Sequence, residues 1–407
     1  MFSLFQSIRK VLPFFIVNIM INLGANFAHP VTPTIFKTLG FGDYMFGYAL
    51  AAMMIVNFLF SPFWGKMNTV FSSRKCLCIT CIGYAVGQFF FGMAQTEGQI
   101  IVIRAFTGFF TGGVFVSLLN YIINVSENET QRSQYLIINA TITAVAGAFG
   151  FLVGGVLGEL STSYAIFAQS FILALSGVLA LFVCKDDRTE QRGPMNAREL
   201  LKEANPFAAF FTSRKFMTVS FAVFFVICVF YSVAQTSFDQ SFNYYLTDQF
   251  HLTSGYNGVF KAVMGIITLV ANSTLCVYLL KKADLKRSLA ALFLLGAAML
   301  LCASLIQSLV WFFVFSALFY ACCSASLPLI QNVVIRQAKG KDSNLVMGFY
   351  NAMKSLGGII GSLLSGTLYA VGAKLPFIMC LSMFLLCAAG CFLFERREKR
   401  EAEGAGK

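Results

Sequence analysis

The stretch KDDRTEQRGPMNARELLKEANPFAAFFTSRK, residues 185–215, divides this chain near its midpoint. It holds seven Lys/Arg and five Asp/Glu, whereas apolar residues dominate the blocks on both sides. We therefore expect an N-terminal block over 1–184, a linker over 185–215, a C-terminal block over 216–394 and a tail over 395–407. Within the linker, the segment that begins at Asn196 has the pattern of a short surface helix with Asn196 as its N-cap.

The composition indicates a membrane protein. Of 407 residues, 57% are apolar and only 12% are charged, whereas soluble proteins carry about 25% charged residues. So few charges would not cover a soluble core of this size. Most of the twelve cysteines lie in apolar runs, which predicts small buried side chains rather than redox groups. With two histidines and no phosphate-binding loop or nucleophile–base motif, we expect no metal, no cofactor and no enzyme activity.

Apolar runs of about 20 residues, the length that crosses a bilayer as a helix, occur six times on each side of the linker. The sequence thus predicts an all-α polytopic protein with two six-helix bundles in a lipid bilayer. The predicted spans are 11–36, 44–64, 75–95, 98–123, 134–157 and 163–184, and then 216–246, 256–280, 288–307, 310–335, 344–372 and 374–394.

Basic residues predict the orientation. With both termini inside, the inside segments hold 25 of the 30 Lys/Arg and the outside loops hold two, Lys37 and Lys374. Arg104, Lys261 and Lys354 fall within spans. We expect a multi-pass protein of the plasma (inner) membrane with both termini cytoplasmic. This distribution also explains the net charge of +12 without a nucleic-acid partner.

The two halves resemble copies of each other. The Gly-rich segment GAFGFLVGG, residues 147–155, matches GIIGSLLSG, residues 358–366, at an offset of 211. Parallel repeats of six helices, related by an axis along the membrane normal, are a transporter design because two bundles can then rock about a central site. The repeat therefore predicts two bundles related by pseudo-twofold symmetry.

The first span carries polar residues on one helical face. Asn18, Asn22, Asn26 and His29 recur at spacings of four, four and three. Because amides are costly in lipid, this face is expected to look into protein or water. Two readings stay open, a wall of a substrate cavity and interhelical hydrogen bonding. His29 is a candidate for titration near neutral pH or for a structural hydrogen bond.

Four charged residues within spans are candidates for the substrate and proton pathway. Inserting Arg104 costs about 2.5–3.5 kcal/mol, so it needs a water-filled cavity, a partner or backbone carbonyls. Asp239, with Asn243 one turn later, is either a protonation site or one half of a static ion pair with Lys261. Lys354 has no acidic partner in the sequence pattern, so it would meet an anionic substrate group or carbonyl oxygens.

Small residues recur on several spans and predict close helix packing. These packing residues are Gly108, Gly112, Gly147, Gly150, Gly154, Gly155, Gly358, Gly361 and Gly366.

Three segments resemble motifs of the major facilitator superfamily, more specifically of its twelve-helix drug:proton antiporter branch. Arg104-Ala-Phe-Thr107-Gly108 is similar to the fourth-helix motif, whose Arg is implicated in proton coupling. Gly150-Phe151-Leu-Val-Gly154-Gly155 resembles the fifth-helix antiporter motif, with Phe151 in place of Pro. Gly65-Lys66-Met67, followed by Arg74-Lys75, resembles the cytoplasmic loop motif between helices two and three, with Asn68-Thr69 where that motif has Asp.

The resemblance implies proton-coupled efflux of a small amphipathic compound or drug by alternating access. We expect the protein to act as a monomer. One alternative is an importer or symporter of a small anionic metabolite that uses Arg104 and Lys354 as charge clamps. A second alternative is a transporter-like sensor or structural membrane protein. Substrate, coupling ion and direction are left open by the residues.

Overall fold

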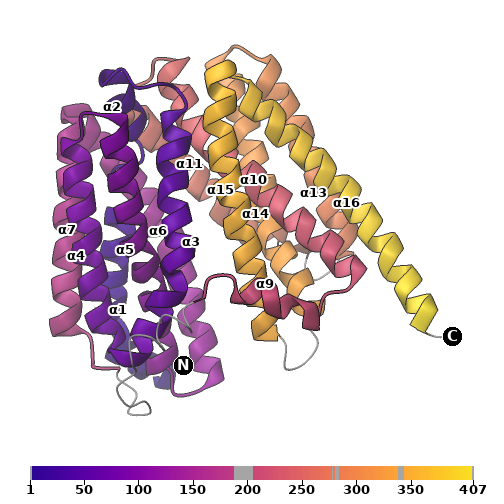
Figure 1. The fold of residues 1–407 in the computed structure, drawn as a ribbon, viewed down its shortest axis with the longest axis horizontal. Coiled ribbons are helices and arrows are strands. Elements are labelled where there is room, and N and C mark those ends of the chain that lie inside the picture. The colour runs from indigo at the N-terminus through magenta and orange to yellow at the C-terminus, as the bar shows by residue number, and fades with distance from the viewer. Residues whose placement is uncertain (1, 188–204, 277, 280–283, 338–342, 406–407) are drawn as a thin grey trace. The chain divides into compact units, whose positions relative to one another are not determined.

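The computed structural model describes residues 2–187, 205–276, 278–279, 284–337 and 343–405 (Figure 1). The helix predicted from Asn196 lies outside these residues. The described chain is helical and contains no strand. Its long N-terminal helices are α1 (Phe2–Ala25), α3 (Met45–Val70), α4 (Ser73–Met93), α5 (Glu97–Val125), α6 (Glu129–Leu160) and α7 (Thr162–Val183).

The second half repeats this order after the short helices α9 (Ala208–Thr212) and η1 (Ser213–Lys215). Its long helices are α10 (Val219–Asp248), α11 (Ser254–Ala271), α13 (Leu285–Leu305), α14 (Leu309–Gln337), α15 (Ser343–Val371) and α16 (Leu375–Ala405). A single π-helical turn, η2 (Asn272–Cys276), follows α11.

Ten of the described helices are long and apolar enough to cross a membrane. They match ten predicted spans, and the all-helical membrane fold is confirmed. The other two predicted spans correspond to α1, whose apolar part is Val11–Ala25, and to α15. The total of twelve spans stays a prediction.

The first span differs from its predicted course over 11–36. Helix α1 ends at Ala25, a turn follows, and the short helix α2 (Thr32–Thr38) begins after it. The break falls around His29-Pro30, where the proline disfavours helical backbone for the residue before it. Pro33 then sits in the first turn of α2, where its missing N–H is tolerated.

The chain folds into two compact units. Unit 1 comprises residues 1–41, 52–206 and 252–263, and unit 2 comprises 42–51, 207–251 and 264–407. Helix α3 therefore begins in unit 2 and continues in unit 1, whereas α11 begins in unit 1 and continues in unit 2. Each half of the sequence thus contributes the start of one helix to the unit that the other half builds.

The core of unit 1 lies among α1, α4, α5 and α7, of which α4, α5 and α7 run side by side in Figure 1. Phe14 on α1 stacks on Tyr121 of α5 with ring centres 4.3 Å apart, and Leu173 of α7 is fully buried beside them. Aromatic pairs of this kind add packing energy beyond the area that they bury.

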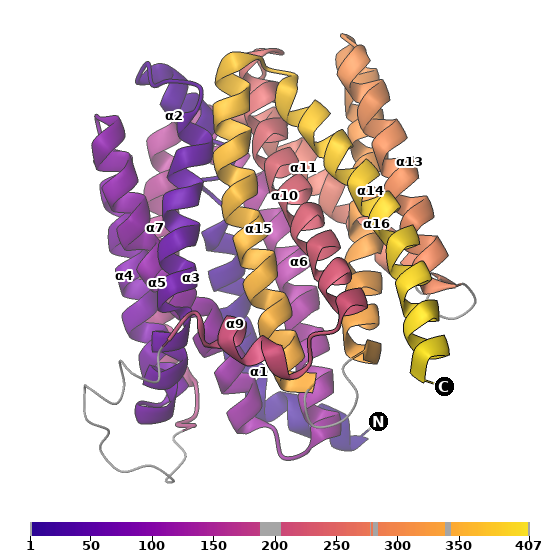
Figure 2. The same ribbon diagram turned by 45° about the vertical axis from the view of Figure 1, so that its right-hand side comes forward.

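The core of unit 2 is also aromatic. Phe238 on α10 lies 4.5 Å from Phe319 of α14, and Phe319 lies 4.9 Å from Phe384 of α16. Figure 2 shows α10, α14 and α16 as neighbours in this unit. The predicted burial of the cysteines is confirmed for eleven of the twelve, and Cys302 is half-exposed.

Candidate functional site

The asparagines of α1 form a hydrogen-bonded ladder inside unit 1. Asn18 donates to the side-chain oxygen of Asn139 on α6 at 2.8 Å, and Asn22 donates to the side-chain oxygen of Asn18 at 2.7 Å. Asn26 donates to the carbonyl of Asn22 at 2.7 Å. Asn18 and Asn22 are buried, whereas Asn26 is half-exposed. The ladder connects α1 to α6. This favours interhelical hydrogen bonding over a wall of a substrate cavity as the role of Asn18 and Asn22.

His29 lies in the turn after α1, against α6. Its ring stacks on Phe151 with centres 5.3 Å apart and planes inclined by 20°. The ammonium nitrogen of Lys261 on α11 lies 5.9 Å from the centre of the same Phe151 ring. The aromatic ring at the position of the motif's Pro thus contacts two candidate pathway residues.

Arg104 on α5 is a buried cation of unit 1. Only 8% of its surface is exposed, and its guanidinium carbon lies 3.9 Å from the centre of the Phe91 ring on α4. No described residue forms a hydrogen bond or an ion pair with it. Its charge is therefore supported by the ring face and by polar neighbours.

Those neighbours come from two helices, α4 and α7, and were missed by sequence reasoning. The Tyr84 hydroxyl on α4 donates to the carbonyl of Ala25 at 3.4 Å and accepts from Gln169 of α7 at 3.3 Å. Gln88 interacts with Tyr84, and the charge of Arg104 acts on the Tyr84 phenol. The signal in the sequence was weak, since it consists of single amides within apolar spans.

The predicted packing glycines lie at close helix contacts. A Cβ on Gly108 would come within 3.0 Å of the Met53 Cα on α3, and one on Gly154 within 2.6 Å of the Phe27 Cα. Gly112 faces Asn57 and Ser61 of α3, Gly150 packs on Leu23 of α1 and on Asn26 just after it, and Gly361 packs on Val233 of α10. At Gly147 a Cβ would make only ordinary contacts, with Asn26, and Gly358 is buried within α15.

Two further contacts join segments from different halves of the sequence. In unit 2, a Cβ on Gly366 of α15 would come within 3.1 Å of the Gly47 Cα on α3. In unit 1, a Cβ on Gly258 of α11 would come within 3.1 Å of the Gly155 Cα on α6. Gly47 and Gly258 are 211 residues apart, as are Gly155 and Gly366. The two crossings are therefore equivalent positions of the repeat.

The loop-motif residues Arg74 and Lys75 begin α4. Arg74 binds Asp186 at 2.6 Å and donates to the carbonyls of Leu181 and Cys184 at 3.4 and 3.3 Å, so it holds the end of α7. Lys75 is exposed, and a Cβ on Gly65 would meet nothing within 4 Å. Asn68, which takes the place of the motif's Asp, donates to Ser117 of α5 at 2.9 Å.

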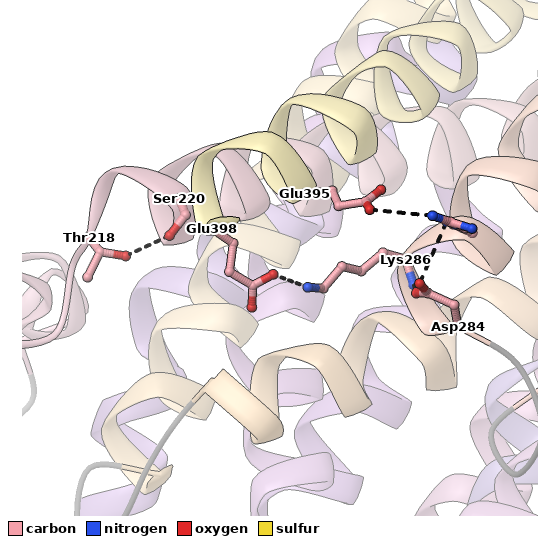
Figure 3. A network of polar contacts seen from close by, with 7 residues as sticks. Thr218, Ser220, Asp284, Lys286, Glu395 and Glu398 are labelled. Atoms are coloured by element: carbon pink, nitrogen blue, oxygen red, sulfur yellow. Dashed lines mark hydrogen bonds and ion pairs between the residues drawn. The ribbon is translucent and has the colours of Figure 1, made fainter. Parts of the chain in front are cut away.

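Unit 2 has a corresponding ion-pair network. Lys286 at the start of α13 pairs with Glu398 near the end of α16, and Arg287 lies 4.0 Å from Glu395 (Figure 3). Asp284 caps α13 by accepting from the backbone of Lys286 at 3.0 Å. Lys286 lies 211 residues after Lys75, and Glu398 lies 211 residues after Asp187. Each repeat therefore has a basic and an acidic residue at the same two positions.

Asp239 lies on α10 in unit 2 and hydrogen-bonds with Tyr320 of α14. Lys261 belongs to unit 1, so its pairing with Asp239 stays a prediction. Asn243 follows one turn after Asp239 on α10, and its amide oxygen is buried. Lys354 on α15 is half-buried and forms no hydrogen bond or ion pair with a described residue.

Two carboxylates near helix ends bind phenols in unit 2. Tyr244 donates to Asp43 at 2.6 Å, and Tyr369 donates to Asp248 at 2.8 Å. The Phe46 ring stacks on Tyr244 with centres 4.7 Å apart. These contacts fasten the start of α3 to α10 and α15, next to the Gly47 crossing.

A family model described as Major Facilitator Superfamily matches residues 14–289 and 273–407. The chain belongs to this superfamily. It is 25% identical over 377 residues to an uncharacterized MFS-type transporter, YuxJ, of Bacillus subtilis (strain 168), covering 89% of this chain and 90% of that protein. It is 21% identical to multidrug resistance protein 1 of the same strain, covering 87% and 88%.

A third superfamily relative is the class C tetracycline resistance protein of Escherichia coli, 22% identical with 90% of this chain and 92% of that protein covered. Among solved structures, a bacterial homologue of the human lysosomal transporter Spinster superposes with a TM-score of 0.77 at 13% identity, covering 96% and 97%. The protein is thus a multi-pass membrane transporter with the superfamily fold.

Proposed function

We propose that this superfamily member is a secondary active transporter that exports a small amphipathic compound in exchange for protons. It would act as a monomer in the plasma (inner) membrane with both termini cytoplasmic. The observation that carries the proposal is the pair of equivalent glycine crossings, Gly47–Gly366 and Gly155–Gly258.

The crossings suit a contact that opens and closes. At each one, helix backbones meet without interlocking side chains, because both facing residues are glycine. Each crossing also joins the start of one helix to the other half of the sequence. At the glycines themselves such a contact can part and re-form without interlocked side chains to separate, which suits a gate in alternating access. Bonds beside the glycines, such as that from Ser362 to the Gly47 carbonyl at 2.8 Å, hold the contact when it is closed.

Asp239 supports the coupling step. Among the described residues, it is the carboxylate that lies inside a predicted span, and intramembrane carboxylates typically serve proton relays. Its side chain hydrogen-bonds with Tyr320 of α14. We propose that proton binding at Asp239 weakens this bond and biases α10 against α14.

The cargo class rests on the relatives. The matched proteins with a named function include multidrug and tetracycline resistance proteins, each over more than four-fifths of this chain. Import of an anionic metabolite is the alternative, and a sensor or structural role is the other. Export predicts that expressing cells lose the compound, import that they gain it, and a sensor moves nothing.

Accumulation in cells tests the proposal. Cells that express the protein should hold less tetracycline, or another amphipathic drug of a panel, than cells that express Asp239→Asn at equal membrane level. A protonophore should abolish the difference. Equal accumulation with every drug of the panel, in energised cells, would refute export of such compounds.

A further inference from the structure

The charges inside the membrane helices are unbalanced. Apart from Lys75 and Lys374, the first residues of their spans, the described parts of the predicted spans carry three cations, Arg104, Lys261 and Lys354, and one carboxylate, Asp239. Within unit 1 the described helices hold acidic residues only near their ends, at Glu97, Glu129 and Glu159. The described helices of unit 1 therefore supply no carboxylate within a predicted span to balance the charge of Arg104.

Arg104 is arranged to receive a ligand. A guanidinium carries five N–H donors in a planar fork that matches a carboxylate or sulfonate. Phe91 supports this group at 3.9 Å, and no described residue accepts from its N–H donors. A charge that is nine-tenths buried and lacks a counter-ion is costly, so an anion placed here would relieve that cost.

The surroundings of Arg104 are polar but neutral. Tyr84 hydrogen-bonds with Gln169, and Gln88 interacts with Tyr84. The side-chain oxygens of Gln88 and Gln169 are buried and have no hydrogen-bond partner among the described residues. A ligand with an anionic group for Arg104 and hydrogen-bond donors for these oxygens would satisfy both sides of the cluster.

Lys354 gives an independent second observation. It lies in the middle of α15 in unit 2, is half-buried, and has no partner among the described residues. Each unit thus presents one intramembrane cation that the described protein does not neutralise. A lipophilic cation entering these surroundings would meet like charge, whereas an anion would meet opposite charge.

We propose that the cargo is an anionic amphiphile, whose carboxylate or sulfonate binds the Arg104 guanidinium and whose apolar part lies against aromatic side chains such as Phe91. This deepens the proposed transport function and rests on it. It also departs from the expectation of a broad drug pocket, because it assigns the specificity to charge. In unit 2, Lys354 is a second intramembrane cation that favours an anion over a cation.

Three dansyl probes that share one fluorophore test the charge preference. They are dansylglycine, which is anionic, dansylamide, which is neutral, and dansylaminoethyl-trimethylammonium, which is cationic. Binding to the full chain in nanodiscs, without any ion gradient, is followed by fluorescence titration. We expect dansylglycine to bind about tenfold or more tighter than the cation, since charge-assisted hydrogen bonds contribute about 1.5–3 kcal/mol, a factor of roughly ten to one hundred.

Variants of Arg104 and Lys354 test which residue causes the preference for the anionic probe. Arg104→Gln should weaken dansylglycine about ten- to hundredfold while dansylamide changes less than about twofold, and Arg104→Lys should fall between. Lys354→Gln should weaken dansylglycine to a smaller degree. Arg132→Gln is the matched control, because Arg132 is a partly exposed residue paired with Glu129 at 3.5 Å. Thermal unfolding of each variant checks that it folds, and Arg104→Lys preserves a test if Arg104→Gln does not.

The results of these experiments distinguish a failure of the anionic-cargo proposal from a failure of the proposed transport. Tighter binding of the cation, or an equal loss of all three probes in Arg104→Gln, would overturn the anionic cargo. Cells that export dansylamide or the cation without preference for dansylglycine would also overturn it and leave transport standing. Selective binding of dansylglycine without movement across the membrane would instead refute the proposed transport.

Discussion

Gly47 of α3 and Gly366 of α15 approach so closely that a Cβ on either residue would lie about 3 Å from the other's Cα, at 2.8 and 3.1 Å. Real Cβ atoms rarely make contacts this short, so both positions need glycine. The equivalent pair, Gly155 and Gly258, gives 3.0 and 3.1 Å. Two contacts at the same places of a repeat, with the same spacing, indicate one shared role.

Replacing Gly366 by Ala should impair transport. The added methyl group would meet the backbone of Tyr44 and Gly47, so α3 and α15 would be forced apart. We expect the rate of drug export to fall by about tenfold or more, although Ala favours a helix by about 1 kcal/mol over Gly. Gly348→Ala on the same helix is the control, because a Cβ there meets nothing within 4 Å. It should keep full export, and wild-type export by Gly366→Ala would contradict a role for the crossing.

The ion pairs at the start of α4 and at the start of α13 should differ in their contribution to stability. Arg74 uses its fork to bind Asp186 and two carbonyls at the end of α7, a geometry that Lys does not reproduce. Arg74→Lys should lower the free energy of unfolding by about 1–2 kcal/mol.

In unit 2, Lys286→Arg keeps a simple, partly exposed pair with Glu398 and should change stability by less than about 0.5 kcal/mol. Denaturant unfolding in detergent, with circular dichroism as the signal, measures both. A larger effect of Lys286→Arg than of Arg74→Lys would show that the carbonyl contacts of Arg74 contribute little.

The asparagine ladder should behave as packing rather than as a substrate wall. The 2.8 Å bond between Asn18 and Asn139 predicts a coupling energy of about 0.6 kcal/mol, with an upper limit near 1.7 kcal/mol, in a double-mutant cycle with Ala. Drug binding by folded Asn139→Ala should stay within about twofold of wild type. A coupling of zero together with lost binding would assign the ladder to the cargo site instead.

Cys184, just after α7, should resist alkylation. Burial, followed by the nearby Asp187 carboxylate, raises the pKa of its thiol to about 12. At pH 8 about one thiol in ten thousand is then the reactive thiolate, so maleimide should label it far more slowly in the folded than in the denatured protein. Peptide mapping by mass spectrometry reads this out, and equal rates in the two states would contradict it.

The raised pKa of Cys184 also makes the stability of the folded state depend on pH. Because the folded thiol of Cys184 holds its proton up to about pH 12, the unfolded thiol ionises first as the pH rises above about 8.5. Deprotonation therefore favours the unfolded state, and this contribution to stability is lost progressively above that pH. Cys184→Ser, which does not ionise in this range, should show a weaker fall in stability between pH 8.5 and 10.

The sequence predicted the helices well because hydropathy and length decide spans in a membrane. It did not predict the break at Ala25, since apolar residues continue on both sides of Pro30 and only local backbone sterics end the helix. The Gly-rich match at offset 211 identified Gly155 and Gly366. Their partners Gly47 and Gly258 were missed, because single glycines in apolar runs carry no pattern until the packing is known.

The candidate site was predicted only in part. Arg104 stood out because charge within a span is costly, and its position on a buried face agrees with that signal. Tyr84, Gln88 and Gln169 did not stand out, because they come from α4 and α7 and share no spacing with Arg104. A cluster built by tertiary packing leaves no periodic trace in a single sequence.

Proton release from inside-out membrane vesicles tests the central claim most directly. The vesicles contain the full chain, are acidified inside and report lumenal pH through a trapped dye, while amphipathic drugs, tetracycline and dansylglycine included, are added outside. We predict that a transported drug triggers an immediate loss of lumenal protons, and that vesicles with Asp239→Asn lose none above the leak of empty vesicles. Drug entry without proton loss, or an undiminished response in Asp239→Asn, would contradict proton-coupled export through this residue.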